Sequence, residues 1–220
     1  MTIVLPYGEF EVLETDHMND QIKNEHFWDL DMRPFLDRVP ANGRAIDVGA
    51  HVGFYSGYWA ATGIRTIAFE AHPAYAPLLA KNIERNKWET MILPVKAFLY
   101  STPRWLVEQP EHETLASNTW LPAGMNVHTD AHLHRYALTL DLFDFGKIDC
   151  IKVDAQGADL HVLLGAKETI ERYRPLILIE FESSLAERHG HTADDYHNWA
   201  RDHRYKEVPI NGHNCCFEPI

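Results

Sequence analysis

Short apolar runs alternate with helix-like segments along most of the chain. Helical spacing of apolar residues covers residues 54–62, 73–86 and 158–173, and Pro73 occupies a first-turn position that proline favours. This alternation predicts an α/β fold in which helices cover both faces of a parallel sheet. The expected strands are Arg44–Val48, Arg65–Glu70, Met91–Leu99, Ile148–Asp154 and Leu176–Phe181.

The two ends of the chain show the same pattern less regularly. Residues 1–40 predict a lead-in of mixed strand and helix, residues 193–203 a last helix, and residues 205–210 and 214–219 two short strands. With 220 residues and 45% hydrophobic composition, we expect a single domain spanning residues 1–220.

Charge and composition narrow the classes of partner. The formal net charge is -12, which argues against a phosphate backbone as the ligand and favours small molecules or sugars. No apolar run is long enough to predict a membrane span, and the interrupted N-terminus does not match a signal peptide. The three cysteines form no CxxC pair, so we expect reduced thiols and a cytoplasmic location.

The first predicted strand runs directly into a glycine-containing turn, DVGAHVG, that precedes a helix. Gly49 and Gly53 permit a close approach of the backbone to a ligand, and the helix start offers N–H groups to an anion. His51 breaks the GxGxxG pattern of dinucleotide sites. Glu70 ends the next strand, where a carboxylate can accept hydrogen bonds from a ribose diol. A nucleoside with an amino-acid tail fits better than NAD, and S-adenosylmethionine has that shape.

Five blocks of the sequence resemble the FkbM family of S-adenosylmethionine-dependent methyltransferases. In order they are DVGAHVGFYS, AFEAHP, KNIERN, ALTLDLF and IDCIKVDAQGADLHVLLGAKETIERYRPLILIEFE. The last block follows the family pattern I-K-x-D-x-E-G-x-E, L-x-G-A and R-P-x-x-x-x-E. Its matching residues are Lys152, Asp154, Gly157, Gly165, Ala166, Arg174, Pro175 and Glu180. Two departures are Gln156 and Asp159, where the family usually has Glu, so the role of the missing carboxylate is open.

The resemblance implies a Rossmann-like methyltransferase fold and transfer of a methyl group to a hydroxyl oxygen. The sheet would be mostly parallel, with seven strands, an antiparallel last strand and flanking helices. The cofactor would be S-adenosylmethionine, and the acceptor a sugar or a small natural product. The expected cofactor contacts are Asp47, Gly49, His51, Gly53, Ser56, Glu70 and Ala71.

Three charged residues at strand ends are the catalytic candidates. In a strand, Lys152 and Asp154 share one face, opposite Ile151 and Val153. Asp154 is placed to accept the proton of an acceptor hydroxyl, and Glu180 to bind a hydroxyl. An aspartate with a pKa near 4 is a weak base, which burial strengthens and Lys152 weakens, and a cation could acidify the hydroxyl instead. The alternative is a purely structural ion pair between Lys152 and Asp154.

Residues 100–147 form a connection longer than a usual crossover, and we expect it to be a substrate lid. Its histidines, His128, His132 and His134, lack the carboxylate pattern of a zinc site, so the sequence supports no metal site, although a divalent cation is left open. Its aromatic residues fit either sugar stacking or packing of the lid: Trp105, Trp120 and Tyr136.

An O-methyltransferase acting on a small-molecule or glycan acceptor is the leading interpretation. An RNA ribose 2'-O-methyltransferase uses similar residues at strand ends, but the acidic charge argues against a nucleic-acid partner. A non-catalytic S-adenosylmethionine-binding module is the third interpretation, because Gln156 replaces a carboxylate. The identity of the acceptor and the formation of a homo-oligomer are left open.

Overall fold

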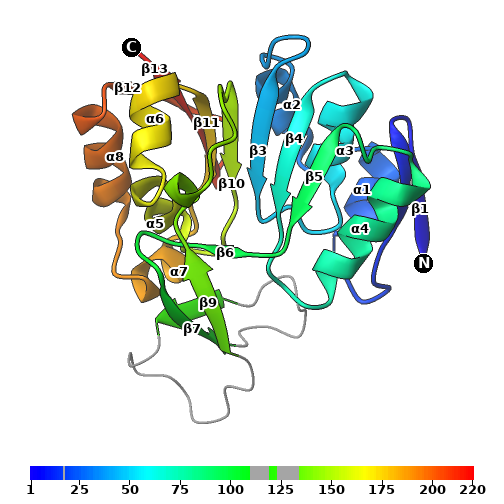
Figure 1. Cartoon of the computed structure of the whole chain (residues 1–220), viewed down its shortest axis with the longest axis horizontal. Coiled ribbons are helices and arrows are strands. Elements are labelled where there is room, and N and C mark those ends of the chain that lie inside the picture. The colour runs from blue at the N-terminus through cyan, green and yellow to red at the C-terminus, as the bar shows by residue number, and fades with distance from the viewer. Residues whose placement is uncertain (17, 110–118, 123–133) are drawn as a thin grey trace.

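The fold is built on one seven-stranded sheet, seen face-on in Figure 1. The computed structural model describes residues 1–220 except 17, 110–118 and 123–133. The strand order is β12-β13-β11-β10-β3-β4-β5, and all strands run in one direction except β13. The strands are β3 (Arg44–Val48), β4 (Arg65–Phe69), β5 (Ile92–Val95), β10 (Cys150–Val153), β11 (Leu176–Glu180), β12 (Tyr205–Pro209) and β13 (Asn214–Pro219). The prediction of a mostly parallel sheet with an antiparallel last strand is confirmed.

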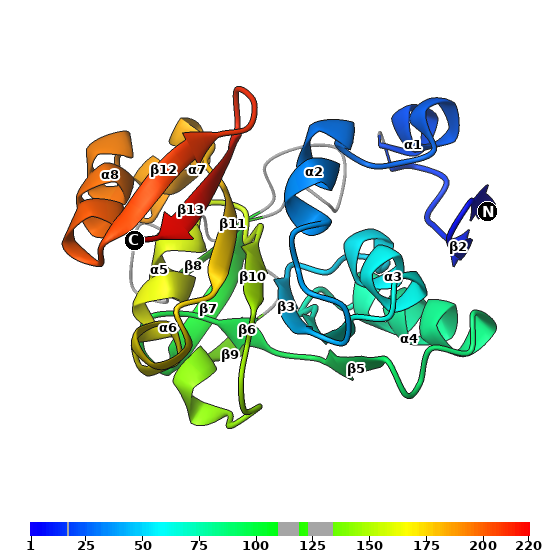
Figure 2. The ribbon, with the colours of Figure 1, turned by 90° about the horizontal axis from the view of Figure 1, so that it is seen from above.

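Helices cover both faces of the sheet, as the view from above shows (Figure 2). The helices α5, α6 and α8 pack on one face, while α2, α3 and α4 pack on the other. None of the helices in the described ranges is long and apolar enough to cross a membrane. The helices of the sheet region are α3 (Phe54–Ala61), α4 (Tyr75–Arg85), α5 (Asp159–Leu164), α6 (Lys167–Tyr173), α7 (Ser183–Arg188) and α8 (Ala193–Asp202).

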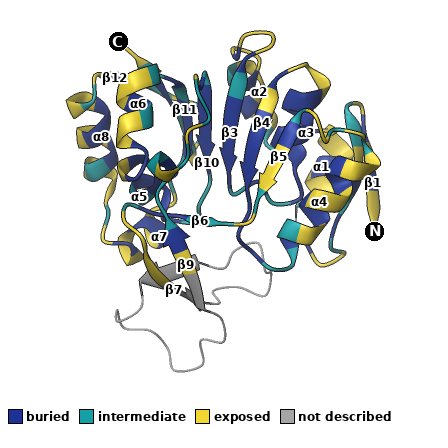
Figure 3. Cartoon of the chain, viewed as in Figure 1, coloured by how far each residue is buried: buried dark blue, intermediate teal, exposed yellow. Residues whose placement is uncertain are grey.

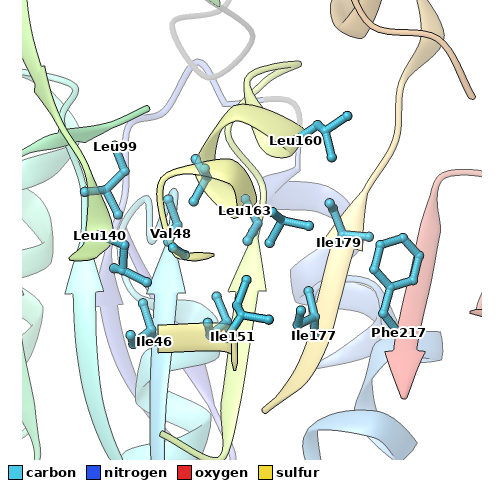
Figure 4. Packing of buried hydrophobic residues seen from close by; sticks show 14 of the residues in the cluster. Ile46, Val48, Leu99, Leu140, Ile151, Leu160, Leu163, Ile177, Ile179 and Phe217 are labelled. Atoms are coloured by element: carbon cyan, nitrogen blue, oxygen red, sulfur yellow. The ribbon is translucent and has the colours of Figure 1, made fainter. Parts of the chain in front are cut away.

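The central strands are buried on both faces (Figure 3). Ile151 and Val153 of β10 lie in the larger hydrophobic cluster, which Figure 4 shows from close by, with side chains from β3, β11, α5 and β13. Cys150 of the same strand packs on the opposite face with residues of α3. Lys152 lies on the α3 face, beside the ring of Tyr55, and therefore opposite Ile151 and Val153, as side-chain alternation predicted.

The lead-in lies against the α3–α4 side of the sheet. The amide side chain of Asn82 in α4 fixes it, because its Oδ1 accepts the N–H of Glu11 at 2.6 Å and its Nδ2 donates to the carbonyls of Glu11 and Val52. The same amide therefore joins the lead-in hairpin to the loop after β3. The lead-in elements are β1 (Thr2–Leu5), β2 (Gly8–Glu11), α1 (Asn19–Glu25), the 3-10 turn η1 (Leu30–Met32) and α2 (Arg33–Leu36).

The predicted single strand over Met91–Leu99 is wrong, because the chain leaves the main sheet after Val95. A tight turn, in which the N–H of Ala97 donates to the carbonyl of Val95 at 3.1 Å, separates β5 from β6 (Phe98–Leu99). Strand β6 begins a second sheet of order β6-β9-β7-β8, on the side where the parallel strands end (Figure 1). Its other strands are β7 (Arg104–Gln109), β8 (Thr119–Pro122) and β9 (His134–Leu138). Its function as a lid stays a prediction.

The predicted continuous helix over residues 158–173 is also wrong, because α5 and α6 are separate at Gly165 and Ala166. A Cβ atom at Gly165 would lie 2.1 Å from the carbonyl oxygen of Tyr100. The helix therefore breaks where the second sheet's connection presses against it, and glycine is the residue that admits this contact.

We predict that Gly165→Ala lowers the free energy of unfolding by about 1–3 kcal/mol, because the methyl group forces the helix junction away from Tyr100. Urea unfolding monitored by circular dichroism measures the change. Gly212→Ala is the control, since an added Cβ there meets no atom within 4 Å, and its effect should stay within about 0.5 kcal/mol. Equal effects of the two variants would contradict the packing argument.

Candidate cofactor and acceptor site

The loop after β3 approaches both neighbouring strands closely. Gly49 has φ +74°, and a Cβ atom there would lie 1.8 Å from the carbonyl oxygen of Asp154. The N–H groups of Gly49 and Ala50 both donate to the carbonyl of Phe69 at 3.0 Å. Gly53, with φ +97°, begins α3 and approaches the side chain of Leu79. The two glycines therefore serve the contact between loop and scaffold, and not only the approach to a ligand that the sequence suggested.

Glu70 follows β4 at the same edge and organises the two adjacent loops. One carboxylate oxygen accepts the N–H of His51 and the other accepts the N–H of His72, both at 2.7 Å. Burial raises the pKa of Glu70 to about 7 although these hydrogen bonds lower it. Each oxygen keeps a second lone pair, so the carboxylate can still accept hydrogen bonds from a diol.

A cavity of about 280 Å³ adjoins Glu70 between α4 and the end of β5. Apolar side chains form most of its wall, and Glu70 closes one side. A flat heteroaromatic base attached to a ribose fits such a wall. The predicted contact Ala71 is buried next to Glu70. The lining residues are Glu70, Ala76, Pro77, Leu79, Ala80, Pro94, Val95 and Lys96.

A buried lysine joins β3 to β10. Lys152 is 3% exposed, and its Nζ lies 3.5 Å from Oδ1 of Asp47 and 3.4 Å from Oδ2 of Asp154. It also donates to the carbonyl of Gly49 at 3.3 Å. The second oxygen of the fully buried Asp47 accepts the hydroxyl of Ser56 at 2.6 Å. Asp47 and Ser56 thus fix the loop and the lysine, while their contact with a cofactor stays a prediction.

Asp154 and Glu180 form a hydrogen-bonded carboxyl pair at the ends of β10 and β11. Burial acts to raise the pKa of Asp154, but Lys152, a hydrogen bond from Glu180 and the amide of Gln156 bring it below its usual value. The charge of Asp154 and burial raise the pKa of Glu180 well above its usual value. Within the pair the proton therefore belongs to Glu180 rather than to Asp154, because the pKa of Glu180 is the raised one and that of Asp154 the lowered one. The Gln156 amide lies 3.0 Å from Asp154 and 3.5 Å from Glu180, so this replacement supports the pair.

Two other positions of the family pattern hold the backbone. Asp159 accepts the N–H groups of Ala155 and Gly157 at 2.6 and 2.9 Å and thereby shapes the loop between β10 and α5. Arg174 donates to the carbonyls of His203 and Arg204, both at 2.7 Å. Asp159 and Arg174 are therefore structural in this chain.

Sequence reasoning missed a lead-in residue that reaches the loop after β3. Asp16 accepts the hydroxyl of Tyr75 at 2.6 Å and lies 3.6 Å from the ring of His51, which packs on Tyr75. Asp16 carries no motif, and only the fold brings it beside the loop after β3.

The histidines that gather in the fold are not those that the sequence suggested. His128 and His132 lie outside the described residues, and His134 is in β9. Instead His161, His189 and His191 lie together around Tyr100. Burial lowers the pKa of His161 to about 4 and that of His189 to about 3, so both are neutral at pH 7.

No group of three or more residues able to hold a metal ion occurs among the residues described. Trp105 and Tyr136 face each other across β7 and β9 with ring centroids 5.4 Å apart, and they are 57% and 48% exposed. Their exposure leaves sugar stacking open as a prediction.

A family model described as "Methyltransferase FkbM domain" matches residues 47–207, which include the whole loop, Glu70 and the carboxyl pair. The chain belongs to the FkbM methyltransferase family. This finding confirms the resemblance seen in the sequence blocks. S-adenosylmethionine is the cofactor of this family. No curated protein matches the chain significantly.

Solved methyltransferases have a similar fold. Methyltransferase FkbM from Methylobacillus flagellatus has a TM-score of 0.53 and 16% identity, covering 80% of this chain and 43% of that one. TrmK, a tRNA methyltransferase of B. subtilis, has a TM-score of 0.51 and 10% identity, and the match covers 87% of this chain and 66% of TrmK. PaMTH1 of Podospora anserina, a methyltransferase solved with S-adenosylhomocysteine (SAH) bound, has a TM-score of 0.51 and 13% identity. The match covers 86% of this chain and 76% of PaMTH1. At these identities the likeness shows the fold alone, and our chain spans less than half of the FkbM structure's length.

We predict that Lys152→Met lowers the free energy of unfolding by about 3–5 kcal/mol, because two carboxylates lose their buried cation. Chemical denaturation measures the loss, which should shrink when Asp47→Asn is added. Lys147→Met is the matched control: its ion pair with Asp149 at 2.6 Å is exposed on the lysine side, so the loss should stay below about 1 kcal/mol. A harmless Lys152→Met would refute the buried bridge.

Proposed function

We propose that this FkbM-family protein is an S-adenosylmethionine-dependent O-methyltransferase whose acceptor is a hydroxyl of a sugar or small natural product. The supporting observation is the carboxyl pair, in which Asp154 accepts a hydrogen bond from the carboxyl of Glu180 beside the loop after β3. Asp154 also touches that loop through its carbonyl oxygen at Gly49. A proton acceptor and a proton donor therefore stand together next to the cofactor loop.

The residues present fit the cofactor. Glu70 would accept hydrogen bonds from the ribose, the apolar cavity beside it would hold the adenine, and the start of α3 would receive the carboxylate. When bound, S-adenosylmethionine supplies an electrophilic methyl group on a cationic sulfur. The protein must then align the acceptor oxygen and remove its proton.

Asp154 is the group that we assign to proton removal. The hydroxyl proton becomes acidic as the oxygen gains a carbon substituent, so a weak carboxylate base is sufficient at that point. The neighbouring carboxylates keep Lys152 charged by raising its pKa, although burial opposes this. Lys152 therefore positions Asp154 and keeps it ionised, and it does not exchange a proton. The carboxyl of Glu180 donates to Asp154, and its other oxygen can accept a hydrogen bond from a hydroxyl of the acceptor.

Two alternatives receive less support. An RNA acceptor would need a basic groove, whereas the net charge is -12 and Lys152 is surrounded by carboxylates. A non-catalytic binding module was suggested by Gln156, but its amide hydrogen-bonds to Asp154 and leaves the ionised carboxylate in place.

The three cysteines are free, which supports a cytoplasmic location.

We predict that the affinity for SAH increases between about pH 6 and pH 8, by up to roughly tenfold. Glu70 has a pKa of about 7, above its ordinary value, so it is protonated at pH 6, and ribose hydroxyls donate more strongly to the ionised form. Calorimetric titration with SAH at pH 6 and at pH 8 measures the ratio of the two affinities. In Glu70→Gln the affinity at pH 8 should fall and the Glu70-dependent increase should vanish; an unchanged increase would assign it to another group.

We predict that Asp154→Asn lowers kcat at least about 100-fold, while Glu180→Gln stays within about tenfold of the parent. Glutamine imitates the protonated state of Glu180, whereas asparagine cannot accept the proton that Asp154 takes. Methyl transfer from labelled S-adenosylmethionine to a panel of hydroxylated acceptors measures both, with SAH affinity as the folding control. Asp154→Asn at parental activity would exclude Asp154 as the base.

A further inference from the structure

The carboxyl edge of the sheet divides into two halves. In strand order it passes from Glu70 through Gly49 and Asp154 to Glu180, which pairs with Asn214 at the start of β13. Neighbouring strands lie about 4.8 Å apart, so β13 lies roughly 10 Å beyond β10. The features that suit a cofactor are on the β3–β5 half. The acceptor half therefore extends from Asp154 towards Asn214.

A lead-in carboxylate covers the far end of the acceptor half. Asp29 accepts a hydrogen bond from Nδ2 of Asn211 at 3.0 Å, and its other oxygen accepts one from Nδ2 of Asn214. Burial raises the pKa of Asp29, the hydrogen bond from Asn211 lowers it, and the charges of Asp31, Glu25 and Asp154 raise it further. Asp29 is half-buried and remains accessible to a ligand.

Tyr55 supplies a second observation at the same place. It is 7% exposed, and its ring lies 5.0 Å from Nζ of Lys152. Burial raises the pKa of its hydroxyl well above the usual value, and the charges of Asp29, Asp154 and other carboxylates raise it further. Among the described residues none forms a hydrogen bond with this hydroxyl. A hydroxyl that lies beside carboxylates and receives no hydrogen bond from the described residues is free to bind a ligand atom there.

Among the residues that the structure describes, no basic side chain forms an ion pair with Asp29. Asp29 and Asp154 carry negative charge, and the basic side chain beside them, Lys152, is shared with Asp47. A sulfonium next to Asp154 would lie two strands away from Asp29, so the cofactor does not account for the second carboxylate. Asp29, Asn211 and Asn214 also lie outside residues 47–207, the part that the family model matches.

We propose that the acceptor carries a protonated amine in addition to the hydroxyl that is methylated, as an amino sugar or another amino-bearing polyol does. Asp29 binds the ammonium group, and the hydroxyl of Tyr55 hydrogen-bonds to the acceptor between Asp29 and Asp154. This inference rests on the proposed function, because it assigns the acceptor class of that same site.

The test uses the full chain saturated with SAH and three matched sets of probes. These are methyl aminohexopyranosides with the amine at each ring position, their N-acetyl derivatives, and the parent hexosides, titrated calorimetrically at about pH 6.5, where the amines are protonated. We expect at least one amine to bind at least about 10-fold more tightly than its N-acetyl derivative. Asp29→Asn should remove this preference. Asp31→Asn, which deletes an exposed charge from the same segment, should keep it.

Tyr55→Phe provides a variant that retains the packing and the ring beside Lys152. It should weaken binding of the preferred amine and of its parent hexoside several-fold, with SAH affinity unchanged. The proposal of an amine-bearing acceptor is refuted if the amines do not bind, or bind no better than their neutral partners. The proposed function is then still tested by methyl transfer to neutral acceptors. The proposal is also refuted if Asp29→Asn changes the affinity for S-adenosylmethionine relative to SAH and leaves probe binding unchanged, because Asp29 would then bind the sulfonium and not an amine of the acceptor. Failure to bind SAH at all refutes the proposed function itself.

Discussion

The ammonium group of Lys152 is the interaction on which the site depends. It lies inside the sheet, between the carboxylates of Asp47 and Asp154, and it also binds the carbonyl of Gly49. A charge in such a place is costly unless partners surround it, and these partners come from β3, the loop after it and the end of β10. One buried cation thus fixes the relative position of the cofactor loop and the proposed base.

The same bridge explains why the two faces of β10 differ. On one face Ile151 and Val153 join the large hydrophobic cluster against α5 and α6. On the other face Cys150 is apolar at the amino end, and polarity begins with Lys152 and increases to Asp154 at the carboxyl end. Most of β10 therefore belongs to the hydrophobic core, and only its carboxyl end, where ligands of parallel sheets bind, contributes residues to the candidate site.

The sequence predicted the features that local pattern controls. Alternating apolar runs located the parallel strands, and the side-chain alternation placed Lys152 and Asp154 on one face. It failed where tertiary contacts override local preference: helix 158–173 breaks because Tyr100 presses on Gly165, and the chain turns out of the sheet at Ala97. Tyr100 is far from Gly165 in sequence, so no periodicity could reveal the helix break, whereas the turn from Val95 to Ala97 is local and lies within an apolar run that hides it.

Residues without a motif were missed for the same reason. Nothing in the pattern distinguishes Asp16 or Asp29 from exposed acidic residues of a lead-in, and the trio around His161 is assembled from α5 and the segment after α7. The histidines that stood out in the sequence did so only because they are close together along the chain. Proximity in the fold, which decides chemistry, depends on the order of the strands.

The lead-in touches both halves of the site from outside the family's matched region. Asp16 contacts Tyr75 and His51 on the cofactor side, while Asp29 contacts Asn211 and Asn214 of the hairpin between β12 and β13 on the acceptor side. The matched residues 47–207 hold the loop, Lys152 and the carboxyl pair, to which we assign the methyl-transfer chemistry. Segments that lie outside that range and still reach the site are therefore where this chain can differ from its family in the choice of acceptor.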